Sequence, residues 1–174
     1  MDSQDIKDAM LQQPMVIELA SMIADNGGEA YLVGGCVRDL LLGIKPNDWD
    51  IEVYHLSPEK VQRTIELFDS VDLVWESFSV WQLHHFPIDV NIPRTERKIG
   101  DGHREFAVDA NPELTVKEAS ARRDYTINSM ALNILSGELY DPYDGQKALR
   151  LRWLVATSEK FVEDPLRPLR GMQL

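Results

Sequence analysis

The hydrophobic positions near the amino terminus follow a helical period. In residues 14–25, the apolar side chains Val16, Leu19 and Ile23 recur three to four positions apart, and the pattern stops before Gly27. This spacing predicts a helix with one buried face that ends at a glycine.

Further along the chain, apolar and polar residues alternate, as in the run DWDIEVY at residues 48–54. A period of two is typical of a strand with one buried face. The same two patterns predict further strands at 30–35, 71–77, 80–85 and 88–94, and helices at 36–43, 57–68, 115–121, 125–132 and from about residue 164. Residues 95–106 are polar, contain two glycines and lack a period, which indicates a loop or hairpin tip. The mixed order predicts an α+β fold, in which helices pack on a small mixed or antiparallel sheet.

Composition narrows the class of protein. The chain has 174 residues, 44% of them hydrophobic, which is enough for one compact domain with a core. The first ten residues are acidic where a signal peptide would be basic, and no apolar run reaches the roughly 18 residues of a membrane span. Cys36 is the only cysteine, so it is interpreted as core filler, and a reducing, cytoplasmic location is expected. The four tryptophans, Trp49, Trp75, Trp81 and Trp153, are also interpreted as core or sheet-packing residues.

The net charge of -11 is unevenly distributed along the chain. Residues 1–93 contain 5 basic and 16 acidic residues, whereas residues 94–174 contain 13 of each. The first half would therefore repel a polyanion unless cations screened it. If the protein binds nucleic acid, the binding surface is expected in the second half or on another domain.

Acidic residues occupy alternate positions at the start of the strand predicted at 48–54. Asp48 and Asp50 are two residues apart and therefore face the same side, and Asp89 occupies an outward position on another predicted strand. Carboxylates that crowd together repel each other, and a divalent cation such as Mg²⁺ removes this repulsion. Three carboxylates from two strands suit a pair of metal ions about 3.5–4 Å apart, as in phosphoryl transfer. Exposed strand carboxylates without a metal remain the alternative for the Asp-x-Asp pattern alone.

A tight turn precedes these carboxylates. Gly34 and Gly35 follow a predicted strand and open the helix predicted at 36–43. Adjacent glycines allow close approach of a backbone to a phosphate group, and free N–H groups at a helix start bind anions. Arg38 lies one turn further on, where its guanidinium can assist.

The run GGxVRDxLLGxxxxDxD at residues 34–50 resembles the signature of the class II tRNA nucleotidyltransferase and bacterial poly(A) polymerase family, within the polymerase-beta-like nucleotidyltransferase superfamily. Four later segments resemble further motifs of this family in the family's order: PRTERK, ARRDYTINSMALN, DPYDG and EDPLRPLRGMQL. The resemblance covers residues 31–174 and implies the head-domain fold of that superfamily.

The resemblance implies roles for individual residues. Asp48, Asp50 and Asp89 would be the catalytic residues that hold two Mg²⁺ ions, and Gly34, Gly35 and Arg38 would contact the triphosphate. In the ARRDYTIN segment, Arg123 would contact the nucleotide, Asp124 would accept a hydrogen bond from the ribose 2′-hydroxyl, and Asn128 would brace the loop. For Arg122, nucleotide contact and a surface salt bridge both remain open.

The segment EDPLR is expected to read the base. Asp164 and Arg167 are three residues apart and share one face of a helix, where an acceptor and a donor side by side can mimic a Watson–Crick edge. A simple ion pair at a helix start is the alternative. Pro168 departs from the family pattern, and if Asp164 caps the helix it removes about the first intrahelical hydrogen bond.

These observations predict three segments: an N-terminal helical segment at 1–29, a catalytic head at 30–157 and the start of a helical neck at 158–174. The expected activity is transfer of CMP and AMP from CTP and ATP to the 3′ end of tRNA (CCA addition). The alternatives are a poly(A) polymerase acting on other RNA 3′ ends, a nucleotide-binding module without turnover, and a glycosyltransferase, which would leave the later motifs unexplained. In the loop at 95–106, basic side chains are expected either to touch the RNA primer or to be solvated: Arg97, Lys98, His103 and Arg104.

Overall fold

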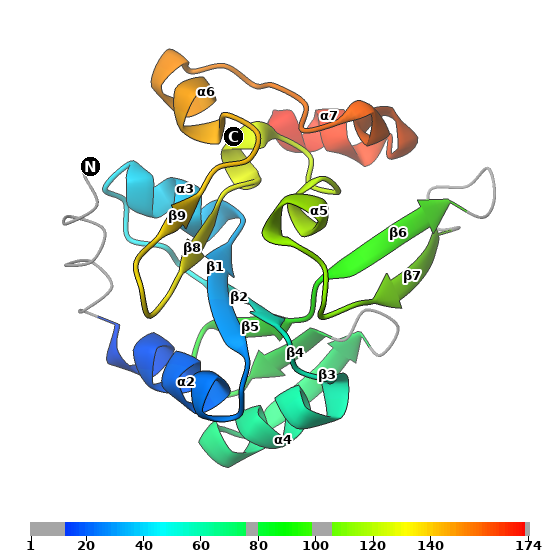
Figure 1. Ribbon diagram of the computed structural model, residues 1–174. Coiled ribbons are helices and arrows are strands. Elements are labelled where there is room, and N and C mark those ends of the chain that lie inside the picture. Colours follow the sequence, from blue (N-terminus) through cyan, green and yellow to red (C-terminus); the bar gives the residue numbers. More distant parts are fainter. Residues whose placement is uncertain (1–12, 76–79, 99–105, 173–174) are drawn as a thin grey trace.

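The computed structural model describes residues 13–75, 80–98 and 106–172 (Figure 1). Its helices are α2 (Pro14–Asp25), α3 (Gly35–Leu41), α4 (Pro58–Phe68), α5 (Val116–Ser120), α6 (Gly145–Leu151) and α7 (Leu166–Gly171), with 3₁₀ turns η2 (Thr126–Asn128) and η3 (Glu159–Glu163). Its strands are β1 (Glu29–Val33), β2 (Trp49–Tyr54), β3 (Val71–Trp75), β4 (Val80–Leu83), β5 (Ile88–Asn91), β6 (Arg94–Lys98), β7 (Phe106–Ala110), β8 (Ala131–Asn133) and β9 (Leu139–Tyr140).

Seven strands form one mixed sheet in the order β3-β4-β5-β2-β1-β8-β9. Strands β2 and β5 are parallel, and the other neighbours are antiparallel. Figure 1 shows α2 and α4 side by side next to this sheet, and the two helices contact each other. The prediction of a small mixed sheet with packed helices is confirmed.

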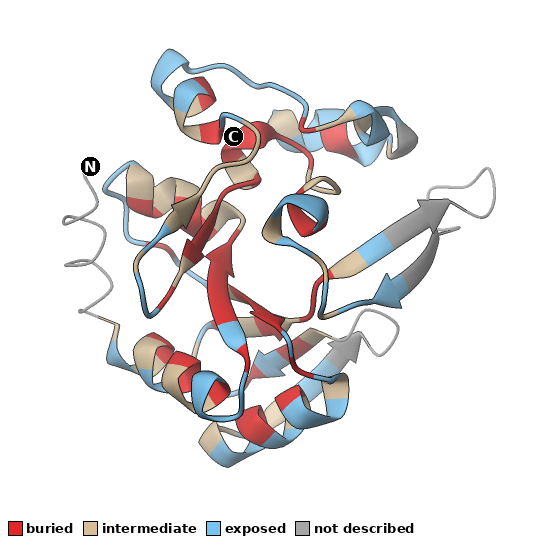
Figure 2. Ribbon diagram, viewed as in Figure 1, coloured by how far each residue is buried: buried red, intermediate tan, exposed pale blue. Residues whose placement is uncertain are grey.

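Strand β2 is the central element for the site because its two faces differ. Trp49, Ile51 and Val53 belong to the main hydrophobic core, together with residues of α2 and α4. The alternate positions, Asp50 and Glu52, therefore lie on the opposite face of the sheet. Figure 2 shows that β1 and β2 are buried along most of their length. Burial of the apolar side chains on one face of β2 thus fixes the direction in which Asp50 and Glu52 point.

The prediction of a helix at 125–132 is wrong. Only η2 (Thr126–Asn128) is helical, and β8 (Ala131–Asn133) then pairs with β1, with Leu132 opposite Leu32. Both leucines are fully or almost fully buried. The pairing buries this segment against the sheet, which outweighs its helical spacing.

The polar segment at 95–106 is partly regular. Strands β6 (Arg94–Lys98) and β7 (Phe106–Ala110) form a separate antiparallel ribbon, which projects from the sheet in Figure 1. His103 and Arg104 lie outside the described residues. The prediction for Trp153 is wrong: its side chain is 57% exposed, whereas Trp49 and Trp81 are buried.

The amino-terminal helix α2 contributes four side chains to the main core: Val16, Leu19, Ala20 and Ile23. It therefore packs in the same core as the sheet, and the domain boundaries predicted at 29 and 157 stay predictions. Across the described residues, no helix is both long and apolar enough to span a membrane.

Candidate active site

Asp50 and Asp89 lie side by side on β2 and β5, and Asp48 is close enough for its charge to act on both. Asp50 lies directly opposite Asp89 in the parallel register, and Asp48 precedes β2 at an exposed position. Burial and then the charge of Asp48 raise the pKa of Asp50 to about 6. Burial also raises the pKa of Asp89, as does the charge of Asp48, against a hydrogen bond from Gln82 Nε2 to Asp89 Oδ1 of 3.1 Å. The raised pKa values thus reflect burial first and, second, repulsion from neighbouring carboxylates.

The donor set suits a hard divalent cation, since it consists of carboxylate oxygens whose charges repel one another. Within the described part of the chain, Asp50 has no ion-pair partner. However, no group of three or more acidic, histidine or cysteine side chains among the described residues is arranged to hold a metal ion. The chemistry of the residues therefore fits a metal, but the side chains do not form a closed cage as they stand.

The turn between β1 and α3 lies beside Asp50. Gly34 has φ +76° and ψ −142°, a conformation that side chains rarely adopt. A Cβ at Gly34 would lie 3.3 Å from Asp50 Oδ2 and 3.5 Å from Arg123 Nη1. The double-glycine turn thus brings bare backbone to the edge of the carboxylate cluster.

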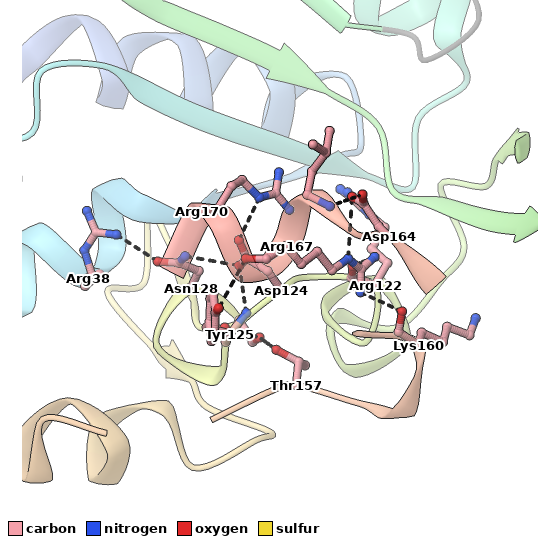
Figure 3. A network of polar contacts seen from close by, with 12 residues as sticks. Arg38, Arg122, Asp124, Tyr125, Asn128, Thr157, Lys160, Asp164, Arg167 and Arg170 are labelled. Atoms are coloured by element: carbon pink, nitrogen blue, oxygen red, sulfur yellow. Dashed lines mark hydrogen bonds and ion pairs between the residues drawn. The ribbon is translucent and has the colours of Figure 1, made fainter. Parts of the chain in front are cut away.

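A hydrogen-bonded chain connects α3 with the segment that follows α5 (Figure 3). Arg38 Nη1 donates to Asn128 Oδ1 at 3.0 Å, and Asn128 Nδ2 donates to Asp124 Oδ1 at 3.2 Å. Arg170 Nε on α7 lies 3.1 Å from Asp124 Oδ2. Asn128 therefore links Arg38 to Asp124, and both oxygens of Asp124 have partners.

Glu52 is a residue of this site that sequence reasoning missed. Its side chain is fully buried; Oε1 accepts from Arg122 Nη2 at 3.1 Å and Oε2 accepts from Arg123 Nη2 at 3.3 Å. Burial alone would raise the pKa of Glu52, but Arg123 and then Arg122 lower it below its ordinary value. The signal was present in the sequence, because Glu52 continues the Asp48–Asp50 alternation by one more step. Arg122 is thus tied to a buried carboxylate rather than to a surface one.

Helix α7 carries Arg167, whose side chain lies in the middle of this polar network, next to Arg122 (Figure 3). Arg167 is 6% exposed; its Nη2 donates to the carbonyl of Arg122 at 2.8 Å and its Nη1 to that of Lys160 at 3.1 Å. Tyr125 Oη donates to the carbonyl of Arg167 at 3.2 Å. Arg167 Nε and Asp164 Oδ2 are 4.0 Å apart, the limit of an ion pair. Arg167 is therefore held mainly by backbone carbonyls.

The expected effect of Pro168 on helix α7 is absent. The helix begins at Leu166, two residues after Asp164, so Pro168 is its third residue. An amide at that position has no intrahelical acceptor in any helix, so proline removes no hydrogen bond there. Asp164 instead accepts from the backbone N–H of Leu166 at 2.9 Å.

These groups surround one cleft of about 430 Å³, within the range of small-molecule sites. Nine of the predicted site residues line it: Gly34, Gly35, Asp50, Asp89, Arg123, Asp124, Asn128, Asp164 and Arg167. Asp48 and Arg38 are not among the lining residues. Arg122, for which sequence reasoning leaves nucleotide contact open, also lines the cleft, as do Arg94 and Arg170, which were not predicted as site residues. Acidic groups thus share the cleft with several arginines, a charge pattern suited to a metal-bound polyphosphate.

The chain matches known proteins along most of its length. Residues 30–155 match the family model described as "Poly A polymerase head domain". A Multifunctional CCA protein of Vibrio parahaemolyticus is 44% identical over 142 residues, which are 82% of this chain and 34% of that protein. One of Xanthomonas campestris is 41% identical over 141 residues, 81% of this chain and 33% of that protein. The chain thus spans about a third of the length of these curated relatives.

Solved structures agree with the sequence matches. The Bacillus stearothermophilus CCA-adding enzyme in complex with CTP has a TM-score of 0.73 and 30% identity, over 90% of this chain and 37% of that one. The Thermotoga maritima CCA-adding enzyme complexed with tRNA, at 24% identity and a TM-score of 0.74, covers 97% of this chain and 40% of that one and supports the fold alone. By sequence and by fold, this chain belongs to the poly(A) polymerase head-domain family of nucleotidyltransferases.

Proposed function

We propose that this chain is a catalytic head that transfers CMP and AMP from CTP and ATP to the 3′ end of tRNA. The observation that carries the proposal is the single cleft in which Asp50, Asp89 and the double-glycine turn lie beside Arg123 and Asp124. The CCA-named relatives support this reaction over others that the same family model covers. Because tRNA processing takes place where tRNA is made and used, a cytoplasmic location is part of the proposal.

Asp48, Asp50 and Asp89 would hold the two Mg²⁺ ions of the proposed reaction. Bound there, such ions would supply charge neutralisation for the triphosphate and a lowered pKa for the attacking 3′-hydroxyl. Asp50 would serve both ions, because it follows Asp48 by two residues and lies opposite Asp89 in the register. The three carboxylates would thereby exchange mutual repulsion for attraction to the cation.

The remaining residues would bind and orient the nucleotide. The bare backbone at Gly34 and Gly35 leaves room for phosphate oxygens next to Asp50. Arg123 lines the cleft and would pair with the triphosphate, while Arg38 would act from the rim through its bond to Asn128. Such positioning, together with charge stabilisation, supplies most of the catalysis in phosphoryl transfer.

Asp164 and Arg167 would read the base by offering an acceptor and a donor to its Watson–Crick edge. The buried guanidinium of Arg167 is oriented by two backbone carbonyls, which leaves little freedom in its position. A fixed donor beside a partly exposed carboxylate would accept cytosine or adenine through small rotations of Asp164.

The test of this function is extension of RNA by the chain in the presence of Mg²⁺. Labelled CTP and ATP are added separately and together to a tRNA that lacks its 3′ CCA and to an oligo(A) primer, and the products are sequenced. Addition of CCA to the tRNA alone is the expected result. Long adenosine tails on oligo(A) would assign a poly(A) polymerase. Nucleotide binding without extension of either RNA would assign a binding module.

Asp124→Ala is expected to reduce the preference for ribonucleotides over deoxyribonucleotides by about 10- to 100-fold, the value of one hydrogen bond to a charged group. The proposed reason is that Asp124, whose oxygens face Asn128 and Arg170 in the cleft, accepts the ribose 2′-hydroxyl. The measurement is kcat/KM for CTP against dCTP. Asp72→Ala, at an exposed carboxylate on β3, is the control. Unchanged selectivity in Asp124→Ala would remove this role.

A further inference from the structure

Arg123 lies between two carboxylates of the same strand. Asp50 and Glu52 both project from the face of β2 opposite the hydrophobic core, two residues apart. Of the two, Glu52 has the ion pair: its Oε2 is 3.3 Å from Arg123 Nη2. Asp50 feels the charge of Arg123 without pairing with it, since that charge opposes the rise in the Asp50 pKa.

The Asp50 carboxylate nevertheless lies close to the Arg123 guanidinium. Asp50 Oδ2 and Arg123 Nη1 lie 3.3 and 3.5 Å from the same point in space, the position that a Cβ on Gly34 would occupy. Gly34 carries no side chain, so nothing from the turn separates the two groups. A modest rotation of the arginine side chain would bring them together.

Arg123 makes few hydrogen bonds. Apart from Glu52, its guanidinium donates through Nη1 to the carbonyl of Asn128 at 3.3 Å. Its Nε is buried and lacks a hydrogen-bond partner among the described residues. The bond to Glu52 is therefore the only ion pair of this guanidinium in the ranges that the structure describes.

We propose that Glu52 is a positioning residue that keeps Arg123 away from Asp50 and so leaves the Asp50 carboxylate free for a divalent ion. The inference rests on the metal-dependent function proposed above. Without the negative charge of Glu52, Arg123 would pair with Asp50, the nearest remaining carboxylate on its side of the strand. A guanidinium at that place would both occupy the carboxylate and repel a cation.

The position of Glu52 argues for this role. A fully buried carboxylate is expensive to desolvate and is weak evidence of stabilisation by itself. Here it is shared between two arginines, and the hydroxyl of Tyr54 donates to it at 2.8 Å. The carboxylate thus has partners on three sides, and two of them are the arginines.

The test measures Mg²⁺ binding directly, with no nucleotide or RNA present. Mg²⁺ is titrated into the ¹⁵N-labelled chain, and the amide signals of Gly34, Gly35 and Asp50 are followed. Glu52→Gln preserves shape and removes the charge, and it is expected to raise the Kd for Mg²⁺ at least tenfold. Tyr54→Phe removes a bond to Glu52 but keeps its charge, and its Kd is expected within twofold of that of the parent.

Each outcome has a distinct meaning. A Glu52→Gln chain that binds Mg²⁺ as the parent does would overturn the inference and leave the proposed function intact. A parent chain whose signals do not respond to Mg²⁺ would instead contradict the metal site of the proposed function itself. If Glu52→Gln fails to fold, Glu52→Asp replaces it; this variant keeps the charge but withdraws it from Arg123, and it is expected to weaken binding at least threefold. A folded Glu52→Asp chain with the Kd of the parent would overturn the inference.

Discussion

The Asp50→Asn variant is expected to lose nucleotide transfer by on the order of a thousandfold and yet to unfold at a higher temperature than the parent in metal-free buffer. The loss of transfer follows from the proposed role of Asp50 between the two metal ions. The gain in stability follows from the structure, because burial and the charge of Asp48 raise the pKa of this carboxyl from 3.8 to about 6. Asparagine has a similar shape and carries no charge.

The sign of the stability effect depends on pH. A carboxyl whose pKa is higher in the folded than in the unfolded protein binds its proton more tightly when folded. Its ionisation therefore destabilises the fold increasingly between pH 4 and 6, and fully above pH 6. At pH 7 the substitution is expected to add about 1–3 kcal/mol to the free energy of unfolding, or a few degrees in Tm. Near pH 4 the two proteins are expected to melt together.

Calorimetric melts in EDTA at pH 7 and pH 4 measure this difference, and Mg²⁺ is then added at pH 7. Magnesium is expected to raise the Tm of the parent and to leave that of Asp50→Asn unchanged. Asp72→Asn serves as the control, because Asp72 is an exposed carboxylate on β3 that pairs with His84. A parent that is already more stable than Asp50→Asn in EDTA at pH 7 would contradict the inference that burial and the charge of Asp48 make the ionised Asp50 carboxylate destabilising.

The fold could be predicted where apolar and polar residues alternate within a single strand. The alternation at 48–54 predicted β2 and the face on which its carboxylates lie, because burial of Trp49, Ile51 and Val53 is a local property of the strand. The segment around β8 was not predictable in this way. It is a strand because it pairs in antiparallel fashion with β1, which lies about a hundred residues earlier in the sequence.

The site divides in the same manner. Short motifs predicted Asp50, Gly34 and Asp124, and the structure places all three along one cleft. The roles of Glu52 and Arg170 were not predicted, because both depend on ion pairs with residues far away in the sequence. Glu52 meets its arginines about 70 residues later, and Arg170 reaches Asp124 from the last helix described. The spacing of residues within one segment does not reveal ion pairs between distant segments.

Gly34→Ala is expected to destabilise the fold and to weaken binding of ATP and CTP by tenfold or more. The backbone conformation at Gly34, with φ +76°, opposes any side chain by about 1–2 kcal/mol. In addition, the new methyl group would stand 3.3 Å from Asp50 Oδ2, in the space assigned to the triphosphate. The first effect belongs to the backbone and the second to the site.

Gly27→Ala separates the two effects. Gly27 has φ +90°, so alanine is strained there as well, but no heavy atom lies within 4 Å of its would-be Cβ. Gly27 follows α2, and it does not line the cleft. Thermal melts are expected to show a similar loss of stability in both variants, and calorimetric titration with ATP or CTP is expected to show weakened binding only in Gly34→Ala. Equal nucleotide affinity in the two variants would mean that the double-glycine turn shapes the backbone without cradling phosphate, and the triphosphate would then have to lie elsewhere in the cleft.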